Sequence, residues 1–194
     1  MLDVEVIDDP AAAVTALDPI RSRLLAELGE PASAAALATR TGLTRQKINY
    51  HLRALENRGL VVAAGERRWG GLRERLLVAS ASSYVVSPGA LGEVGADPGR
   101  TGDRLSASYL IALAARAVRE VGGMWRLARD TDKRLATLSI DTAIRFRTPA
   151  ERSRFTEDLS DAVTALAARY HDETAEHGRT HRLVLVAYPM PTDT

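Results

Sequence analysis

The stretch 34–62, AAALATRTGLTRQKINYHLRALENRGLVV, decides the fold of the first half of this 194-residue chain. Its apolar spacing predicts a short helix over residues 34–40 and a second helix over residues 44–58. Thr44 is suited to cap the N-terminal end of the second helix. Gly42 lies between them, where a tight turn needs a residue that tolerates the left-handed conformation. The second helix has one apolar stripe, formed by Ile48, Leu52 and Leu55.

The polar face of the helix predicted over residues 44–58 contains no acidic residue in its first three turns. A solvated helix face is usually rich in Glu and Lys, whereas this face is formed mainly by Arg, Gln, Asn and Tyr. Arg pairs with guanine and Asn or Gln with adenine in the major groove, which admits a helix. The alternative is a solvated helix in a small bundle. We favour the DNA interpretation, and the predicted contacts on this helix are Thr44, Arg45, Gln46, Lys47, Asn49, Tyr50 and Arg53.

Residues 60–81, LVVAAGERRWGGLRERLLVASA, predict a β-hairpin because two apolar runs flank a glycine-rich centre. The hairpin is rich in Arg, which follows a phosphate backbone or enters a narrow minor groove. Trp69 has two equally weighted interpretations, which are stacking on a sugar or base and packing against the hairpin. The predicted DNA contacts of this wing, at residues 66–75, are Arg67, Arg68 and Arg73, and Arg75 lies beside them.

The segment from Asp18 to Ala79 resembles the winged helix-turn-helix of ArsR-type transcriptional regulators, of an actinobacterial-like kind. The residues behind this resemblance are an Arg-bearing helix after Pro19, the runs LATRTGL and HLRALENRGLV, and GERRWG at the hairpin tip. MarR-type regulators share much of this pattern. The resemblance implies a homodimeric repressor that reads a palindromic operator through helix 44–58 and the wing.

Two alternatives to this reading remain open. One is a winged helix that contacts another protein rather than DNA, which predicts an apolar recognition face. The other is a MarR-like regulator that senses a small molecule. The operator sequence, the effector and the sign of regulation are not visible in the sequence.

The excess positive charge of the chain lies in residues 19–80, which contain the predicted helices and wing that contact DNA and are called the reading head below. The whole chain has a formal net charge of only +1. Residues 1–18 contain five acids and no base, residues 19–80 contain eleven bases and five acids, and residues 81–194 contain fifteen of each. A local basic field is what phosphate binding requires. There is no cysteine, which excludes disulfides, thiolate metal sites and cysteine catalysis. No apolar run is long enough to span a membrane, so we expect a cytoplasmic protein.

The glycine-rich residues 89–102 predict a linker between a DNA-binding domain at 1–88 and a C-terminal domain at 103–194. Residues 103–130 form one long helical pattern that contains many small residues. Because winged-helix repressors of this kind pair through long helices, this helix is the main dimer candidate, with an intrachain core helix nearly as well supported. Two aromatic residues on it, Tyr109 and Trp125, are candidates for contact with an effector, although lone aromatics on a helix more often pack in a core.

The end of the chain predicts a small β-α-β unit, which makes the expected fold class α+β. Residues 136–146 alternate apolar and polar side chains, as in a half-buried strand. Thr148 and Glu151 form a capping box that starts a helix running to about His177. Residues 181–188 are apolar on both faces, as in a covered strand. We expect this unit to stabilise a dimer or to hold an effector.

Neither a metal site nor an active site is predicted. His171 and His177 are nearly two helical turns apart, so they do not easily reach one ion, and Arg169 precedes His171 where an acid would be needed. His51 adjoins the buried stripe and is expected to pack and to form hydrogen bonds rather than to read DNA. No GxSxG, phosphate-binding loop or dinucleotide fingerprint is present. We therefore expect no enzyme activity and no cofactor, and the expected partners are double-stranded DNA, a second copy of the chain and an unidentified effector.

Overall fold

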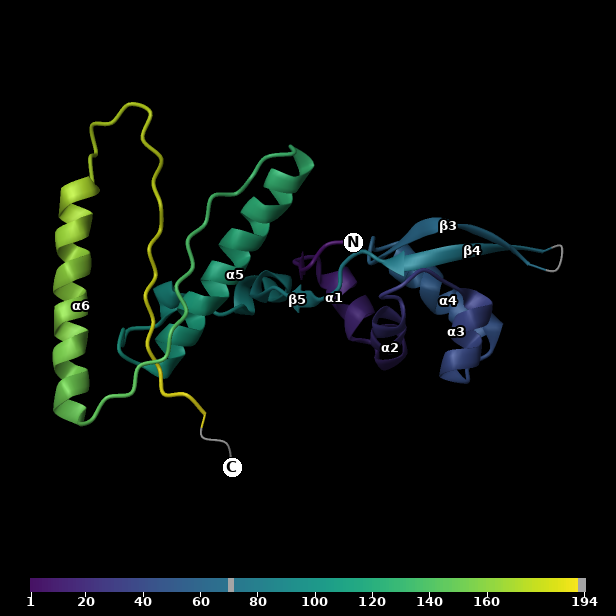
Figure 1. Ribbon diagram of the computed structural model, residues 1–194, viewed down its shortest axis with the longest axis horizontal. Coiled ribbons are helices and arrows are strands. Elements are labelled where there is room, and N and C mark those ends of the chain that lie inside the picture. Colours follow the sequence, from purple (N-terminus) through teal and green to yellow (C-terminus); the bar gives the residue numbers. More distant parts are fainter. Residues whose placement is uncertain (70–71, 192–194) are drawn as a thin grey trace. The chain divides into compact units, whose positions relative to one another are not determined.

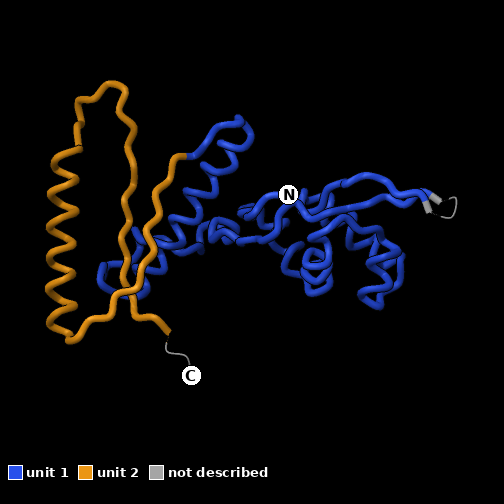
Figure 2. Tube along the Cα trace, in the orientation of Figure 1, with its two compact units in different colours: residues 1–135 blue, residues 136–194 orange. Residues whose placement is uncertain are grey.

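The computed structural model describes residues 1–69 and 72–191 (Figure 1). It is an α+β protein whose contacts divide it into two compact units, Met1–Leu135 and Ala136–Thr194 (Figure 2). The domain boundaries predicted around residues 89–102 stay a prediction. No helix among the described residues is both long and apolar enough to cross a bilayer.

Four short helices form the reading head of the first unit, and each begins where a side chain caps it. Their bounds are Pro10–Leu17 (α1), Pro19–Glu27 (α2), Ala34–Thr41 (α3) and Arg45–Glu56 (α4). The capping side chains accept hydrogen bonds from backbone N–H groups in the first turn, which have no partner inside a helix. These caps are Asp9, Asp18, Ser33 and Thr44.

Gly42 makes the turn between α3 and α4 and has a φ of 73°. Its backbone N–H donates to the Ala38 carbonyl oxygen at 3.0 Å, which closes the end of α3. A residue with a Cβ is strained in this left-handed conformation. The predicted helix, turn and helix are therefore confirmed to within one or two residues at each end.

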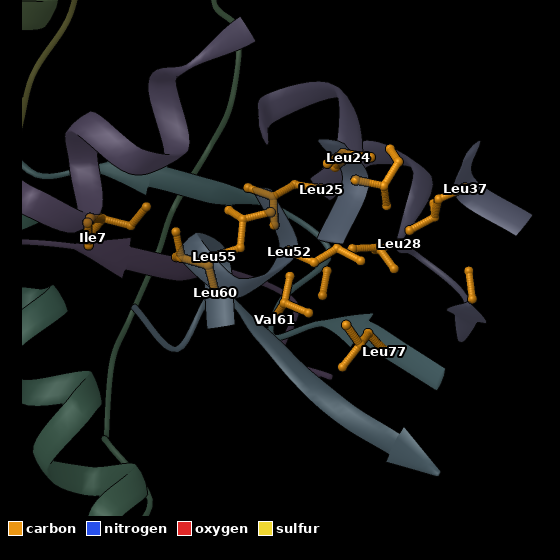
Figure 3. Close-up of a cluster of buried hydrophobic side chains, with 14 of the residues drawn as sticks. Ile7, Leu24, Leu25, Leu28, Leu37, Leu52, Leu55, Leu60, Val61 and Leu77 are labelled. Carbon is orange, nitrogen blue, oxygen red and sulfur yellow. The ribbon is translucent and has the colours of Figure 1, made fainter. Parts of the chain in front are cut away.

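The core of the reading head lies where α2, α3 and α4 meet (Figure 3). The predicted stripe of α4 is confirmed, because Ile48 and Leu55 are fully buried and Leu52 is 3% exposed. These side chains pack with Leu24, Leu28 and Leu37, which have no exposed surface. Burying an aliphatic side chain of this size contributes about 1.5–3 kcal/mol. The helices α2 and α3 are thus fixed against the back of α4, and its polar face is left outside.

A three-stranded antiparallel sheet follows α4 and includes the predicted hairpin. Strands Val61–Trp69 (β3) and Leu72–Ala79 (β4) pair along their length, and Ala32–Ser33 (β2) pairs with the other edge of β4. The register shifts between Ala63 and Gly65, where Gly65 has a φ of 123°. This β-bulge increases the local twist of the hairpin. The Gly70–Gly71 tip of the predicted wing lies outside the described residues.

Residues near the N-terminus form a short strand. Glu5–Ile7 (β1) runs parallel to Tyr84–Val86 (β5) in a separate two-stranded sheet. The Tyr84 hydroxyl donates to the Leu60 carbonyl oxygen at 2.9 Å and so joins this sheet to the segment between α4 and β3.

Residues predicted as a linker contain two short 3-10 helices, Pro88–Val94 (η1) and Pro98–Arg100 (η2), which contact the next helix. That helix is Ala107–Asp130 (α5), which starts four residues later than predicted because Ser106 caps it. It packs on β1, where Arg126 donates to the Val6 carbonyl oxygen at 2.8 Å and forms an ion pair with Asp8.

The second unit is centred on one helix, Pro149–Tyr170 (α6). The predicted capping box is present in a shifted form. Thr148 Oγ1 accepts from the Glu151 N–H at 3.1 Å, whereas the Glu151 carboxylate accepts from the Arg147 N–H at 2.7 Å. The helix ends at Tyr170, earlier than the predicted His177.

The two strands predicted in the second unit are not formed. Residues 136–146, before α6 in the sequence, and residues 181–188, after it, form no strand. Figure 2 shows both as extended segments without a regular helix. The prediction was wrong on this point because an alternating pattern describes which faces a strand would bury, whereas a strand also requires a hydrogen-bonded neighbour. The β-α-β arrangement is therefore not present within the described residues of one chain.

Candidate nucleic-acid interface

The outward face of α4 forms a shallow groove of about 690 Å³. The same helix buries its opposite face in the core, so the groove side chains project from a fixed backbone. Every predicted contact of α4 is exposed, and Tyr50 retains 67% of its surface. The residues that line the groove are Arg45, Gln46, Asn49, Tyr50, Arg53, Ala54 and Asn57.

The sequence reasoning missed Asn57, although a simple signal was available. Asn57 lies four residues after Arg53 and caps the C-terminal end of α4. Residues four apart share a helix face. Asn57 therefore extends the row of amide and guanidinium groups along the groove by one turn.

The N-terminal end of α4 combines a cap with two cations. Thr44 Oγ1 accepts from the Lys47 N–H at 3.3 Å, so this predicted contact residue is partly engaged as a cap. The side chains of Arg45 and Lys47 have no hydrogen bond or ion pair with any described residue. The positive end of a helix dipole and these two cations favour an anion at the same place.

The acidic residue nearest to the groove is neutralised. Glu56, in the last turn of α4, forms an ion pair with Arg75 of β4. This hydrogen bond raises the pKa of the Arg75 guanidinium above its usual value. Arg75 is therefore occupied by an internal partner, and the electrostatic character of the groove is set by Arg45 and Arg53.

The hairpin places two arginines directly opposite each other. Arg68 on β3 faces Arg73 on β4 in the strand register. Like charges in this position are unfavourable unless an anion or acid compensates them. Arg73 lies 3.7 Å from Glu66, whereas Arg68 has no ion pair with any described residue. The predicted contact Arg67 is paired with Glu74 at 3.2 Å. The side chain of Trp69 lies outside the described part of the structure.

His51 is buried behind Tyr50, with 6% of its surface exposed and its ring edge against the tyrosine at 5.2 Å between centroids. Burial lowers the pKa of His51 below its usual value, while the charge of Asp18 opposes this and Arg21 and Lys47 reinforce it. It packs as predicted. The predicted hydrogen bonding is not found at Nδ1, which has no partner among the described residues.

The two effector candidates lie far apart on α5. Tyr109 is half-buried and Trp125 is 40% exposed. At 1.5 Å per residue, a helix separates their backbones by about 24 Å, so one small ligand does not contact both in one chain. Their effector role stays a prediction.

Among the described residues, no group of three or more His, Asp or Glu side chains is placed to hold a metal ion. His171 lies 3.4 Å from Glu173 at the end of α6, on a fully solvated surface.

Comparison with known proteins agrees with this geometry over the reading head. A model of the helix-turn-helix domain matches residues 16–62, which span α2, α3 and α4. No curated protein matches the chain. Among solved structures, the chain is similar to a PadR family transcriptional regulator from Eggerthella lenta DSM 2243, with 18% identity and a TM-score of 0.28. That match covers 58% of this chain and 77% of the other. A TM-score this low leaves the fold to rest on the structure and on the domain match.

Proposed function

We propose that this protein is a DNA-binding transcriptional regulator of the winged helix-turn-helix class, of ArsR type, and that it acts as a homodimeric repressor. It reads a palindromic operator through residues 44–58, while the wing at residues 66–75 contacts the flanking backbone. A small-molecule effector that releases it from DNA belongs to the same proposal.

The single observation that supports this proposal is the outward face of α4. It offers guanidinium, amide and phenol groups in one groove, and Glu56, the acid at its end, is neutralised by Arg75. Arg, Asn and Gln are the side chains that pair with base edges in the major groove. The buried core of a protein interface is depleted of charge, whereas this groove is lined by the guanidinium groups of Arg45 and Arg53. We therefore favour DNA over a protein partner.

The proposal assigns different tasks to different residues. Gln46 and Asn49 project from the first half of α4, the part of a recognition helix that contacts bases. Arg45, Lys47 and Arg53, together with Arg68 of the wing, contact phosphates, which position the protein without reading sequence. The contribution of the phosphate contacts depends on salt, whereas base contacts set the preference for one sequence over another.

The proposed homodimer suits the geometry of the DNA. One α4 reads a half-site of a few base pairs, and a two-fold pair of reading heads reads two half-sites about 34–36 Å apart. In this proposal the dimer forms through α5, which has small residues along its length and exposes Ile111, Met124 and Leu127.

The experiment that tests the function is selection of bound duplexes from random or genomic DNA with the purified full-length protein. The expected result is an enriched motif with two inverted half-sites. Gln46→Ala and Asn49→Ala are then expected to lower the preference for this motif over a random duplex by about 1–3 kcal/mol per lost base contact. Arg53→Ala is expected to weaken both duplexes alike.

The matched control is Arg154→Ala, which removes an exposed arginine from α6 in the second unit. It is expected to leave both affinities unchanged. Failure to enrich any motif, together with no binding of duplexes at low salt, would refute the proposed function. Equal losses on specific and random duplexes for all the α4 variants would refute base reading while leaving DNA binding intact.

A further inference from the structure

The second unit does not bury its own apolar side chains among its described residues, 136–191. None of its described residues is buried, although it contains a helix of 22 residues and two apolar segments. Leu138 is 83% exposed, Ile140 is 79% exposed and Leu183 is 66% exposed. Residues 136–191, with no buried residue among them, have no hydrophobic core of their own to offset the entropy of ordering them.

The backbone of this unit also lacks partners, because its strand-like segments have no hydrogen-bonded neighbour among the described residues. Residues 181–188 have the composition of a strand, but they form no ladder with residues 136–146 or with any other described segment. An extended strand with unpaired N–H and C=O groups is a template for pairing with another strand. Within its described residues, the unit therefore supplies neither a cover for these side chains nor a paired strand for this backbone.

We propose that a second copy of this chain supplies both, and that residues 181–188 of two chains pair antiparallel across a two-fold axis near Leu185. This inference builds on the homodimer proposed above and adds an interface that the helix α5 does not provide. Residues 136–146 of each chain then form the outer strands of a four-stranded intermolecular sheet, and the two α6 helices lie against it.

The charge pattern favours self-pairing of residues 181–188. Residues 183–188, LVLVAY, contain no charged side chain. Antiparallel pairing centred on Leu185 places each Val184 opposite Val186 of the other copy and each Leu183 opposite Ala187. No like charges meet in this register, whereas self-pairing of residues 136–146 about Asp141 would place two carboxylates opposite each other.

The position of each segment in the proposed sheet follows from its pattern. Residues 183–188 are apolar on both faces, which is typical of an inner strand. Residues 136–146 alternate apolar with polar side chains, which is typical of a strand with one solvated face. The segments lack charge where two copies meet, and residues 136–191 have seven basic and eight acidic side chains, so two copies do not repel each other strongly.

The exposed apolar area is comparable with that of a stable dimer. Eleven large apolar side chains among the described residues of the second unit are exposed. At roughly 70 Å² of recoverable surface each, they account for about 800 Å² per chain, which is the amount that each partner of a specific interface buries.

Site-specific disulfide formation in the full-length protein tests the proposal, because the chain has no cysteine of its own. Leu185→Cys places two sulfur atoms opposite each other at the two-fold axis, within the Cβ separation of about 4 Å that a disulfide needs. The expected result is a covalent dimer on mild oxidation with diamide. Leu183→Cys and Ala187→Cys are the matched controls, because each would lie about 13 Å from its own copy in this register.

The double variant Leu183→Cys with Ala187→Cys is expected to cross-link again, because these positions face each other between chains. We expect Leu185→Cys to cross-link at least about tenfold faster than either control. A maximum at Val184 or Val186 would support the pairing with its centre moved by one residue. Uniformly slow cross-linking over residues 181–188 in a protein that is dimeric by light scattering would overturn it.

Amide hydrogen exchange of the unmodified protein provides a second measurement that does not depend on any variant folding. The proposal predicts that the amides of residues 183–187 are protected in the dimer and lose protection on dilution. Protection that does not change with concentration would show that the chain covers this segment itself and would overturn the proposal. Cross-linking without duplex binding would remove the proposed function alone, and duplex binding without cross-linking would remove this inference alone.

Discussion

Removing Arg53 and Arg68 together should halve the salt dependence of DNA binding. Four cations on the proposed DNA-facing surface lack an acidic partner among the described residues: Arg45, Lys47, Arg53 and Arg68. Arg67 and Arg73 have internal partners and contribute less. If each of the four neutralises one phosphate, a dimer makes about eight contacts, and the logarithm of affinity falls against the logarithm of salt with a slope of about −7. The double variant keeps about four contacts, which gives a slope of about −3.6.

The assay is fluorescence anisotropy of a labelled duplex that carries the selected motif, titrated over about 50–300 mM salt. The matched control is Arg152→Ala with Arg154→Ala, which removes the same charge from α6. This control should keep the slope of the unmodified protein. If the double variant Arg53→Ala, Arg68→Ala has a slope within about one unit of the unmodified protein, these arginines do not contact phosphates and the assigned surface is wrong.

Three further predictions concern stability and are measured by chemical denaturation of the full-length protein. Gly42→Ala should lower the free energy of unfolding by about 1 kcal/mol, because the turn requires a positive φ although the site is open; an unchanged value would show that the turn relaxes. Burial lowers the pKa of His51, so the unfolded state takes up a proton near the usual pKa while the folded state does not. Stability should therefore fall as the pH falls through about 6.5 and level off below the folded-state pKa, and His51→Gln should lose this component; equal pH dependence in both proteins would contradict it. Gly122→Ala should lower the free energy of unfolding by about 1–3 kcal/mol, because its Cβ would lie 2.7 Å from Val6 Cγ1. The Cβ of the control Gly123→Ala meets nothing within 4 Å, so this variant should leave the free energy of unfolding unchanged or raise it. Similar effects of both variants would show that α5 does not pack closely on β1 at this point.

The helices and the turn of the reading head could be predicted from the sequence because each depends on residues that are close together in the chain. The cap at Thr44, the turn at Gly42 and the stripe of Ile48, Leu52 and Leu55 all act within a few residues of α4. Spacing alone then determines which face of α4 is buried and which is free. For the same reason, the exposed positions of Gln46 and Asn49 followed directly from the pattern.

The parallel pairing of β1 with β5 could not be predicted in the same way. About 80 residues separate Glu5 from Tyr84, and the alternation in residues 2–7 indicates a strand without identifying its partner. The ion pairs that fasten α5 to this strand, including Arg129 to Glu5 at 2.8 Å, are equally distant in sequence. Charge content predicts that such pairs exist, but only the fold selects which residues form them.

These long-range contacts connect the proposed dimer helix to the recognition helix through one continuous path. Arg126 of α5 forms an ion pair with Asp8 and donates to the Val6 carbonyl oxygen. Arg58, just after α4, lies 3.7 Å from Asp9, the N-cap of α1. Asp8 and Asp9, the two residues between β1 and α1, therefore each pair with an arginine, one on α5 and one just after α4. Asp8 and Asp9 are adjacent in the chain, so the two ion pairs meet at one point of the backbone. The acids at positions 5, 8 and 9 therefore tie β1 and the start of α1 to α5 on one side and to Arg58, just after α4, on the other, through ion pairs that only the folded chain brings together.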